Sequence, residues 1–416
     1  MAPSMSNRRT RVWSAMLDQV FSSASNGIFT FAVAVVSTKQ SFGEIALMIT
    51  ALVAILAAQR GAVGIPLMLK SGQTAERIRR EGSFALLAGL VIGSAALAVL
   101  VTIGYQVGLP AVFLAVSAPI VSCQDILRHV AIAEGRPHVA ATWDGVWFVG
   151  TVLLLVSAWL KLSTASWLIG GWAGLGLIAF AGMAADLRTL PRLHGFTRWA
   201  RAGWQHRIRY GVDAGVDQTT SFLVLAMATV VLSPTAAAAL RGATLLLAPI
   251  TILAAAVQLV VISESTRNSA PPRAVWRAAL RLTVGLAGLA VLAGVVLCRL
   301  PGSVGAYFLG QSFELAQYVL PVVVVEYCAT LVAFGLGIFL RTFNRSSDAM
   351  RFKLAAGLAL LVASACAALL FHNVRGVAVG LAVGTILVTS LGLAYYAPWE
   401  VRAAPKPGTP ESPVTP

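Results

Sequence analysis

Long apolar stretches alternate with short polar ones along most of the chain. A helix needs about 20 residues to cross a hydrocarbon layer about 30 Å thick, and these stretches reach that length. They lack the two-residue alternation of barrel strands, so helices are the better interpretation. The pattern therefore predicts an all-α polytopic membrane protein of about 12 transmembrane helices. The expected spans are 12–36, 42–68, 82–103, 109–130, 139–160, 164–184, 208–232, 237–263, 276–297, 313–340, 352–371 and 376–397.

Composition strengthens this prediction. Hydrophobic residues make up 58% of the 416 residues, charged residues make up only 11%, and the mean hydropathy is +0.81. A soluble protein of this length would need a far more charged surface. The stretches 109–130 and 276–297 are the weakest, and either could instead form a re-entrant segment.

The basic residues are distributed unevenly between the predicted loops. If the N-terminus is cytoplasmic, the cytoplasmic segments hold 25 of the 31 Lys and Arg residues, the outer loops hold five, and Arg60 lies within a span. This asymmetry follows the positive-inside rule, so we expect a bacterial inner-membrane protein with both termini in the cytoplasm. The net charge of +15 is explained by contact with inner-leaflet lipids, without a nucleic-acid partner.

The longest polar connection, residues 185–207, divides the predicted helices into two halves. We expect an N-terminal six-helix lobe (1–184), a basic cytoplasmic linker, a C-terminal six-helix lobe (208–397) and a disordered tail (398–416). A shift of 199 residues aligns Asp18 with Asp217, Gln19 with Gln218 and Gln59 with Gln258. Six helices per half make the two repeats parallel, as in transporters whose two lobes flank a central cavity.

Polar residues inside the first two spans are candidates for function. A charge at the bilayer centre costs about 2.5–3.5 kcal/mol on insertion scales, so it normally faces a cavity or a partner. Asp18, Gln19 and Asn26 lie on the first span, and Gln59 and Arg60 on the second. Counting about 1.5 Å per residue places Asp18 roughly 9 Å and Arg60 roughly 12 Å from the cytoplasmic end, so an Asp18–Arg60 contact is geometrically possible. These polar residues either hold the helices of each lobe together or line a polar cavity between the lobes.

The second half of the chain repeats some of these polar positions. Asp217, Gln218 and Gln258 would lie at the same level, and Arg241 at the outer mouth of the eighth span. Arg241 is either a late contact on a transport path or a solvated surface residue. Glu326, near mid-depth of the tenth span, either carries a proton or is a buried carboxyl hydrogen-bonded to a neighbour. The candidates for ion coupling are therefore Asp18, Asp217 and Glu326.

Small residues line one face of the second span from Gly43 to Gly64, with Gly61 among them. Such stripes permit close helix approach in lipid, and they could also form a sliding surface. Pro66, Pro119, Pro249 and Pro321 are candidates for helix bends.

Several short motifs resemble one family. They are Leu17-Asp18-Gln19, Asn26, Phe42-Gly43, Gln59-Arg60, Pro66-Leu67, and Ala239-Leu240-Arg241-Gly242-Ala243 with Pro249. Together they resemble the Wzx-type polysaccharide flippases of the multidrug/oligosaccharidyl-lipid/polysaccharide exporter superfamily. The resemblance implies that a polyprenyl-diphosphate-linked oligosaccharide is turned from the inner to the outer leaflet through a cationic cavity by alternating access. It implies Arg60 as the cationic contact, and polysaccharide polymerase or export machinery as possible partners.

Other classes of protein remain as alternatives. An ion-coupled exporter of drugs or small metabolites, of the same superfamily or of the major-facilitator type, has the same number of helices. The stretch 72–80 partly resembles the major-facilitator loop motif, but Arg79 replaces its second glycine. An enzyme is not expected, because the outer loops are short and the five His residues form no catalytic constellation. We find no catalytic residues, no metal-ligand spacing among the four Cys residues, and no cofactor motif.

Overall fold

The computed structural model describes residues 5–70, 73–254, 271–343 and 345–402, and the regular elements of these ranges are helices. Eleven of the helices are long and apolar enough to cross a membrane. The pair Pro234–Leu246 and Ala248–Ala254, bent by 48°, makes a twelfth span if it is counted as one. The predicted all-α class with about 12 spans is confirmed.

The first half of the chain contains eight elements. They are α1 (Met5–Val36), α2 (Lys39–Gln59), η1 (Arg60–Gly64), α3 (Ile65–Met68), α4 (Ala75–Gly104), α5 (Leu109–Ala133), α6 (Pro137–Trp159) and α7 (Ala165–Leu187). The linker helix α8 (Phe196–Arg201) follows. The second half contains α9 (Trp204–Val231), α10 (Pro234–Leu246), α12 (Pro272–Arg299), α13 (Gly302–Leu309), η2 (Gly310–Ser312), α14 (Phe313–Thr342), α15 (Ser346–Phe371) and α16 (Val374–Arg402).

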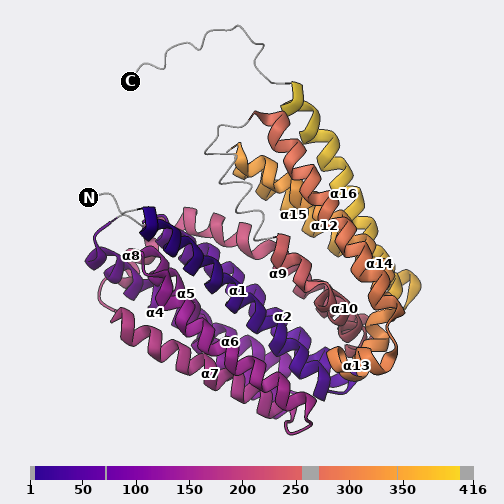
Figure 1. Cartoon of the computed structure of the whole chain (residues 1–416), viewed down its shortest axis with the longest axis horizontal. Helices are drawn as coiled ribbons and strands as arrows, with labels where there is room; N and C mark the ends of the chain where they lie inside the picture. Colours follow the sequence, from indigo (N-terminus) through magenta and orange to yellow (C-terminus); the bar gives the residue numbers. More distant parts are fainter. Residues whose placement is uncertain (1–4, 71–72, 255–270, 344, 403–416) are drawn as a thin grey trace.

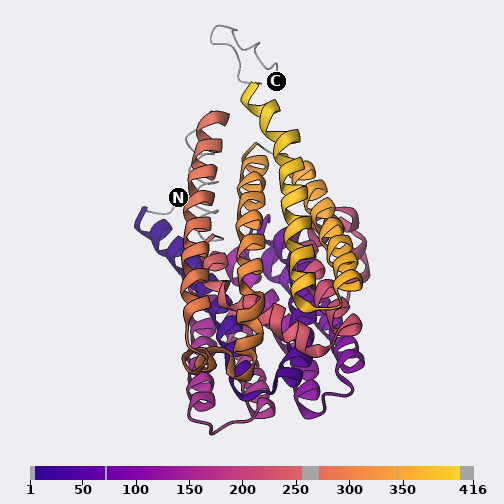
Figure 2. The ribbon, with the colours of Figure 1, turned by 90° about the vertical axis from the view of Figure 1, so that its right-hand side faces the viewer.

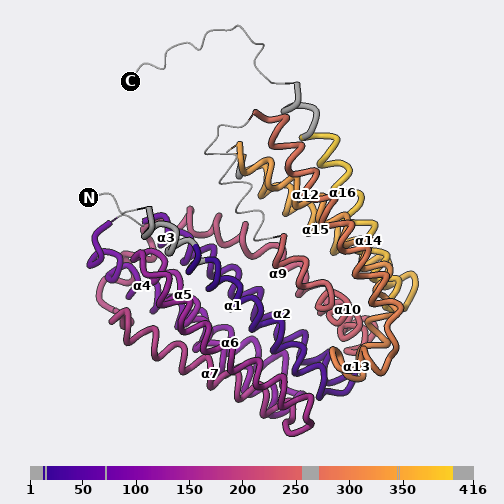
Figure 3. Tube along the Cα trace, in the orientation of Figure 1, coloured from indigo at the N-terminus to yellow at the C-terminus, as the bar shows by residue number. Residues whose placement is uncertain are grey.

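These helices form two lobes. In the first, α1 packs on α6, α4 on α5, and α5 on α7. In the second, α12 packs on α14, and α16 on both α14 and α15. In the second lobe, α12, α14 and α16 lie close to the first lobe at the end that contains α13 and diverge from it toward the end that carries both termini, whereas α9 stays packed on α2 and η1 (Figures 1 and 2). The chain trace shows that α9 and α10 run beside α2, between the two groups of helices (Figure 3).

The small-residue stripe of α2 forms the seam between the lobes. A Cβ atom added at Gly43 would lie 1.8 Å from the carbonyl oxygen of Pro234, and one at Gly61 would lie 2.1 Å from that of Tyr210. Both partners are backbone atoms of the second lobe, so they cannot move aside as a side chain could. Close approach is therefore confirmed at these two glycines. Gly64 instead packs against the His129 ring of α5, within the first lobe.

We expect Gly61→Val to force the lobes apart at this seam. The added side chain overlaps the backbone of α9, and overpacking of this kind typically costs about 1–3 kcal/mol. Thermal unfolding of the detergent-purified protein should show a lowered midpoint. Gly174→Ala is the matched control, because a Cβ at Gly174 meets no atom within 4 Å. An unchanged midpoint in Gly61→Val would contradict the tight seam.

The structure adds detail to the predicted spans. The bend expected from Pro249 is confirmed: the eighth span breaks at Leu247, two residues earlier, because the proline ring cannot continue the preceding α-helix. The second span contains a π-helical turn, η1, that begins at Arg60. The two stretches suspected of re-entry form the uninterrupted helices α5 and α12, so that alternative is wrong. The helix α16 continues past Pro398 to Arg402, and the rest of the expected tail lies outside the described residues.

The basic linker is docked on the first lobe through Trp199 of α8. Its indole Nε1 donates to Glu81 Oε2 on α4 at 2.7 Å, and Lys70 Nζ lies 2.8 Å from the same oxygen. Arg207, in the first turn of α9, stacks its guanidinium over the Trp199 ring at 3.8 Å. Trp199 thus ties the start of the second lobe to α4 of the first lobe.

Candidate functional site

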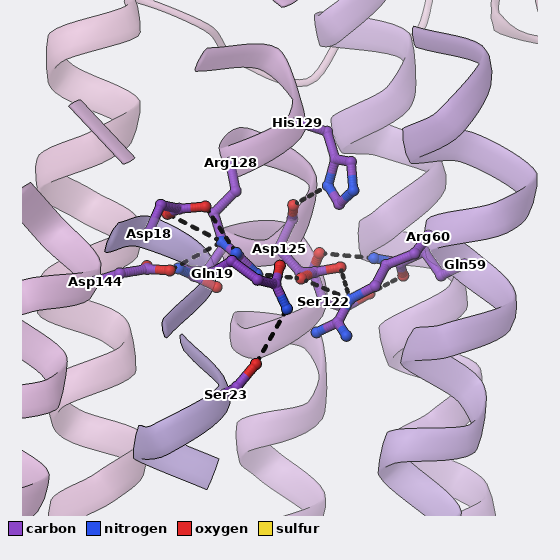
Figure 4. A network of polar contacts seen from close by, with 11 residues as sticks. Asp18, Gln19, Ser23, Gln59, Arg60, Ser122, Asp125, Arg128, His129 and Asp144 are labelled. Atoms are coloured by element: carbon purple, nitrogen blue, oxygen red, sulfur yellow. Dashed lines mark hydrogen bonds and ion pairs between the residues drawn. The ribbon is translucent and has the colours of Figure 1, made fainter. Parts of the chain in front are cut away.

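A buried charge network lies at the centre of the first lobe, and Arg128 of α5 is its hub. Arg128 Nη2 is 2.8 Å from Asp18 Oδ2 on α1, and Arg128 Nε is 2.8 Å from Asp144 Oδ2 on α6. Arg128 Nη1 donates to Asp125 Oδ1 one turn earlier on α5, at 3.2 Å. One guanidinium therefore joins three helices through three carboxylates (Figure 4).

Arg60 joins this network at its edge. Its Nε lies 2.9 Å from both Oδ1 and Oδ2 of Asp125. Among the described residues, Arg60 makes hydrogen bonds through Nε alone, and Figure 4 shows its two terminal nitrogens turned away from Asp125. The Arg60 side chain is 35% exposed, whereas that of Asp125 is 2% exposed. The guanidinium thus keeps its outer pair of nitrogens available for another anion.

The network carries more negative than positive charge. Three carboxylates (Asp18, Asp125 and Asp144) face two guanidiniums (Arg60 and Arg128). Fixed charges far from water are costly unless they are balanced. Counted over the carboxylates and guanidiniums alone, one negative charge is in excess, and His129, whose Nδ1 lies 2.7 Å from the Asp125 carbonyl oxygen, is a further titratable group beside them. That makes the cluster suited to binding or releasing a positive charge.

A small cavity adjoins Arg60 and two of the carboxylates, Asp125 and Asp144. It has a volume of about 20 Å³, enough for a water molecule. Its lining comprises Ser22, Ser25, Asn26, Leu56, Arg60, Val121, Gln124, Asp125, Asp144 and Trp147. The lining combines hydroxyl and amide groups with both signs of charge, so the cavity can accept a polar guest.

Uncharged polar groups fix the helices around the network. Gln59 Nε2 donates to the carbonyl of Ser122 at 2.9 Å, and Ser122 Oγ donates to the carbonyl of Gly89 at 2.7 Å. Gln124 Nε2 donates to Asp144. Gln59 is buried and satisfied by α5, so it joins α2 to α5.

The expected Asp18–Arg60 contact is wrong. Asp18 pairs with Arg128, and Arg60 pairs with Asp125. The depth estimate placed both residues at one level, but level does not determine which helices are neighbours. The helix α1 packs mainly on α6, and α5 provides the partners for both α1 and α2. Gln19 is exposed and donates to Ser23 Oγ at 3.0 Å, while Asn26 lines the cavity.

The second lobe contains a related but balanced cluster. Lys353 Nζ on α15 lies 2.9 Å from Asp217 Oδ2 on α9, and Arg341 Nη2 on α14 lies 3.4 Å from Asp213 Oδ2. Two carboxylates face two cations, so no charge is in excess. Gln218 is half-buried, and its side chain has no hydrogen-bond partner in the part of the chain that the structure describes. Gln258 lies outside the described residues.

Two charged residues of the second lobe stand apart from that cluster. Arg241 Nε is buried and has no hydrogen-bond partner among the described residues. On α10 it follows Pro234 and Ala238, which face Gly43 of α2, at helical spacings of seven and three. Arg241 therefore lies near the lobe seam rather than on the outer surface. Glu326 on α14 accepts from Thr330 at 2.7 Å and from Thr385 at 3.4 Å, with no cation among the described residues beside it.

The sequence interpretation missed Asp125, Arg128 and Asp144. Each is a charged residue within a predicted span, and Asp125 and Arg128 have the three-residue spacing of one helix face. That signal could have identified them. Arg128 lies two residues before the expected end of its span, so in the sequence it is easily grouped with the basic residues of the adjacent cytoplasmic segment. No group of three or more His, Cys, Asp or Glu placed to hold a metal ion occurs in the described ranges.

Comparison with known proteins shows the fold. No family model matches the chain, and no curated protein matches it. An inward-facing multidrug resistance MATE family transporter of the MOP superfamily superposes with a TM-score of 0.68 at 13% identity, covering 92% of this chain and 95% of the other. An outward-facing MATE family transporter superposes with a TM-score of 0.61 at 15% sequence identity, covering 95% of this chain and 96% of the other.

A third solved structure is a MOP superfamily transporter from Pyrococcus furiosus. It gives a TM-score of 0.57 at 15% identity and covers 95% of each chain. It is described by a reverse polarity of its binding pocket that suggests a different function. The chain therefore has the two-lobed fold of these transporters, and its own side chains must indicate its cargo.

Proposed function

We propose that this protein is an alternating-access transporter of the inner membrane that turns a polyprenyl-diphosphate-linked oligosaccharide from the inner to the outer leaflet. The observation that carries the proposal is the orientation of Arg60. Its Nε is held by Asp125, and its terminal nitrogens are turned outward. A planar guanidinium held in this way suits bidentate recognition of a phosphate oxygen pair.

Arg241 provides a second contact for the same anion. It lies on the α10 side of the seam, and its buried Nε lacks a partner within the described ranges. An unpaired buried cation is costly, and an anionic guest would remove that cost. Arg60 and Arg241 belong to different lobes, so one diphosphate could pass from the first to the second as the lobes rock.

Alternating access is supported by the arrangement of the lobes. The second-lobe helices α12, α14 and α16 diverge from the first lobe toward the end with both termini, and the superposition is better on the inward-facing than on the outward-facing MATE structure. In this proposal the headgroup enters from the cytoplasm and the polyprenyl tail stays in the bilayer. A proton crossing 100 mV supplies about 2.3 kcal/mol to drive the cycle.

A second candidate is an exporter of cationic drugs or metabolites. The excess carboxylate of the first lobe favours it, because Asp125 and Asp144 line the cavity and could attract a cation. The fold is equally compatible with this cargo. The two candidates differ in the sign of the charge that is recognised.

Deletion of the gene distinguishes them. Polyprenyl-linked oligosaccharides would be extracted from the deletion strain, and their leaflet would be assigned with a membrane-impermeant probe. Accumulation on the cytoplasmic leaflet, reversed by the wild-type gene, is the expected result. Unchanged lipid-linked sugars together with increased drug sensitivity would favour the second candidate.

For Glu326 we expect a role in proton coupling. It is an acid in a membrane-spanning helix with two threonine hydroxyls and no described cation as neighbours. Glu326→Gln keeps the shape and the hydrogen bonds but cannot release a proton. We expect transport driven by a pH gradient in proteoliposomes to fall at least about tenfold while cargo exchange without a gradient continues. Asp217→Asn is the comparison, because Lys353 already neutralises Asp217. Equal loss in both assays would indicate a structural role for Glu326.

A further inference from the structure

The Arg60–Asp125 pair indicates how cargo is both bound and released. We infer that Asp125 is a positioning residue that holds the Arg60 guanidinium in the empty transporter and gives it up to the anionic group of the cargo. This inference rests on the proposed function, because it assumes that Arg60 meets an anion. Asp125 then acts as a built-in competitor for the cargo.

The geometry of the pair fits such an exchange. Both oxygens of Asp125 lie 2.9 Å from Arg60 Nε, so the carboxylate binds this one nitrogen and not the two terminal nitrogens of the guanidinium. Carboxylates commonly bind the guanidinium fork through two nitrogens, and that stronger geometry is unused here. An incoming phosphate can therefore bind the terminal nitrogens before Asp125 lets go.

Asp125 also has a second partner that remains when Arg60 leaves. Its Oδ1 accepts from Arg128 Nη1 at 3.2 Å, and Arg128 is fixed in turn by Asp18 and Asp144. A buried carboxylate stripped of all partners would cost several kcal/mol, and Arg128 prevents that. The exchange of partners at Arg60 is thus possible without stranding a buried charge.

The backbone is irregular at Arg60. The regular α-helix of α2 ends at Gln59, and the π-helical turn Arg60–Gly64 begins at Arg60 itself. Such turns insert one extra residue and are frequent at functional sites. Gln59, one residue earlier, is hydrogen-bonded to Ser122 on α5, so the turn begins directly after a residue that is tied to the neighbouring helix.

The competitor should weaken binding and speed release. Removing the charge of Asp125 while keeping its shape therefore has an unusual predicted outcome, a gain in affinity. A purely structural pair would show a loss or no change. For Asp125→Asn we expect about tenfold tighter binding of an isoprenoid diphosphate, with a lower KM and a lower turnover in transport.

The test uses the full chain in lipid nanodiscs and titrates it with geranylgeranyl diphosphate at constant ionic strength. Asp144→Asn is the matched control, because it removes one carboxylate from the same network without touching Arg60. Its affinity should change less than about threefold. In the Arg60→Ala background, Asp125→Asn should have no effect, because the competition needs Arg60.

The outcomes separate the inference from the proposed function. If the probe binds through Arg60 but Asp125→Asn binds it no more tightly, the inference is wrong and the function stands. If the probe fails to bind, or binds equally to Arg60→Ala, the proposed function itself fails. A measurement on the wild type needs no Asp125 variant. The ¹⁵Nε–H resonance of Arg60, assigned by its absence from Arg60→Ala, should shift when the probe is added, and an unmoved resonance would overturn the exchange.

Discussion

Arg60→Ala should strongly reduce transport while leaving the protein folded. The lost contacts are charge-assisted hydrogen bonds to the cargo, and two of them together contribute about 3 kcal/mol, or about 100-fold in transport rate at low cargo concentration. Folding should survive because the side chain is 35% exposed and because Asp125 keeps Arg128 as its partner. The measurement is flipping in proteoliposomes, with thermal unfolding of the same preparation beside it.

Two further variants sharpen the test of Arg60. Arg60→Lys keeps the charge but not the planar fork, so we expect it to recover only part of the activity. Arg79→Ala is the matched control, since Arg79 is 44% exposed and pairs with Glu134 within the first lobe, outside the network. Normal transport by Arg60→Ala would remove Arg60 from the site, and loss of folded protein would make it a structural residue.

Arg128→Met should have the opposite signature, a loss of folded protein. Arg128 is the shared partner of Asp18, Asp125 and Asp144, and the side chains of all three are 2% exposed or less. Removing one partner of a buried ion pair typically costs about 3–5 kcal/mol, and here Asp18 and Asp144 lose their charged partner together. We expect a collapsed yield of monodisperse protein and a strongly lowered unfolding midpoint.

A compensating variant tests this explanation. Arg128→Met combined with Asp18→Asn and Asp144→Asn leaves the single balanced pair of Arg60 and Asp125. We expect the combination to recover most of the stability, because no buried charge is unpaired. Arg341→Met in the second lobe is the control: its side chain is 34% exposed and Lys353 remains beside Asp213. A mild Arg128→Met, or a triple variant no better than the single one, would contradict the role of Arg128.

The sequence predicted the spans well because the bilayer imposes length and apolarity on each helix. The small-residue stripe from Gly43 to Gly61 also indicated a close approach, which the structure places at the lobe seam. The bend of the eighth span at Leu247 was predicted from Pro249 and not from hydropathy. Hydropathy averages over a window, so it does not reveal a bend within an apolar stretch.

The candidate site was only partly predictable. Asp18 and Arg60 were correctly identified as buried or half-buried polar residues. Their partners were not identified, because pairing depends on how α5 lies between α1 and α2. The neighbours of a helix cannot be deduced from a single sequence. The same applies to Asp217, whose alignment with Asp18 gave no indication that Lys353 would neutralise it.

The most direct test of the central claim is flipping by the purified protein in proteoliposomes. The vesicles would contain a fluorescent polyprenyl-diphosphate-linked oligosaccharide, and a membrane-impermeant quencher would report its leaflet. We predict fast, Arg60-dependent exchange between leaflets and no competition by a cationic drug. Flipping no faster than in protein-free vesicles, together with Arg60-independent uptake of a cationic drug, would contradict the account.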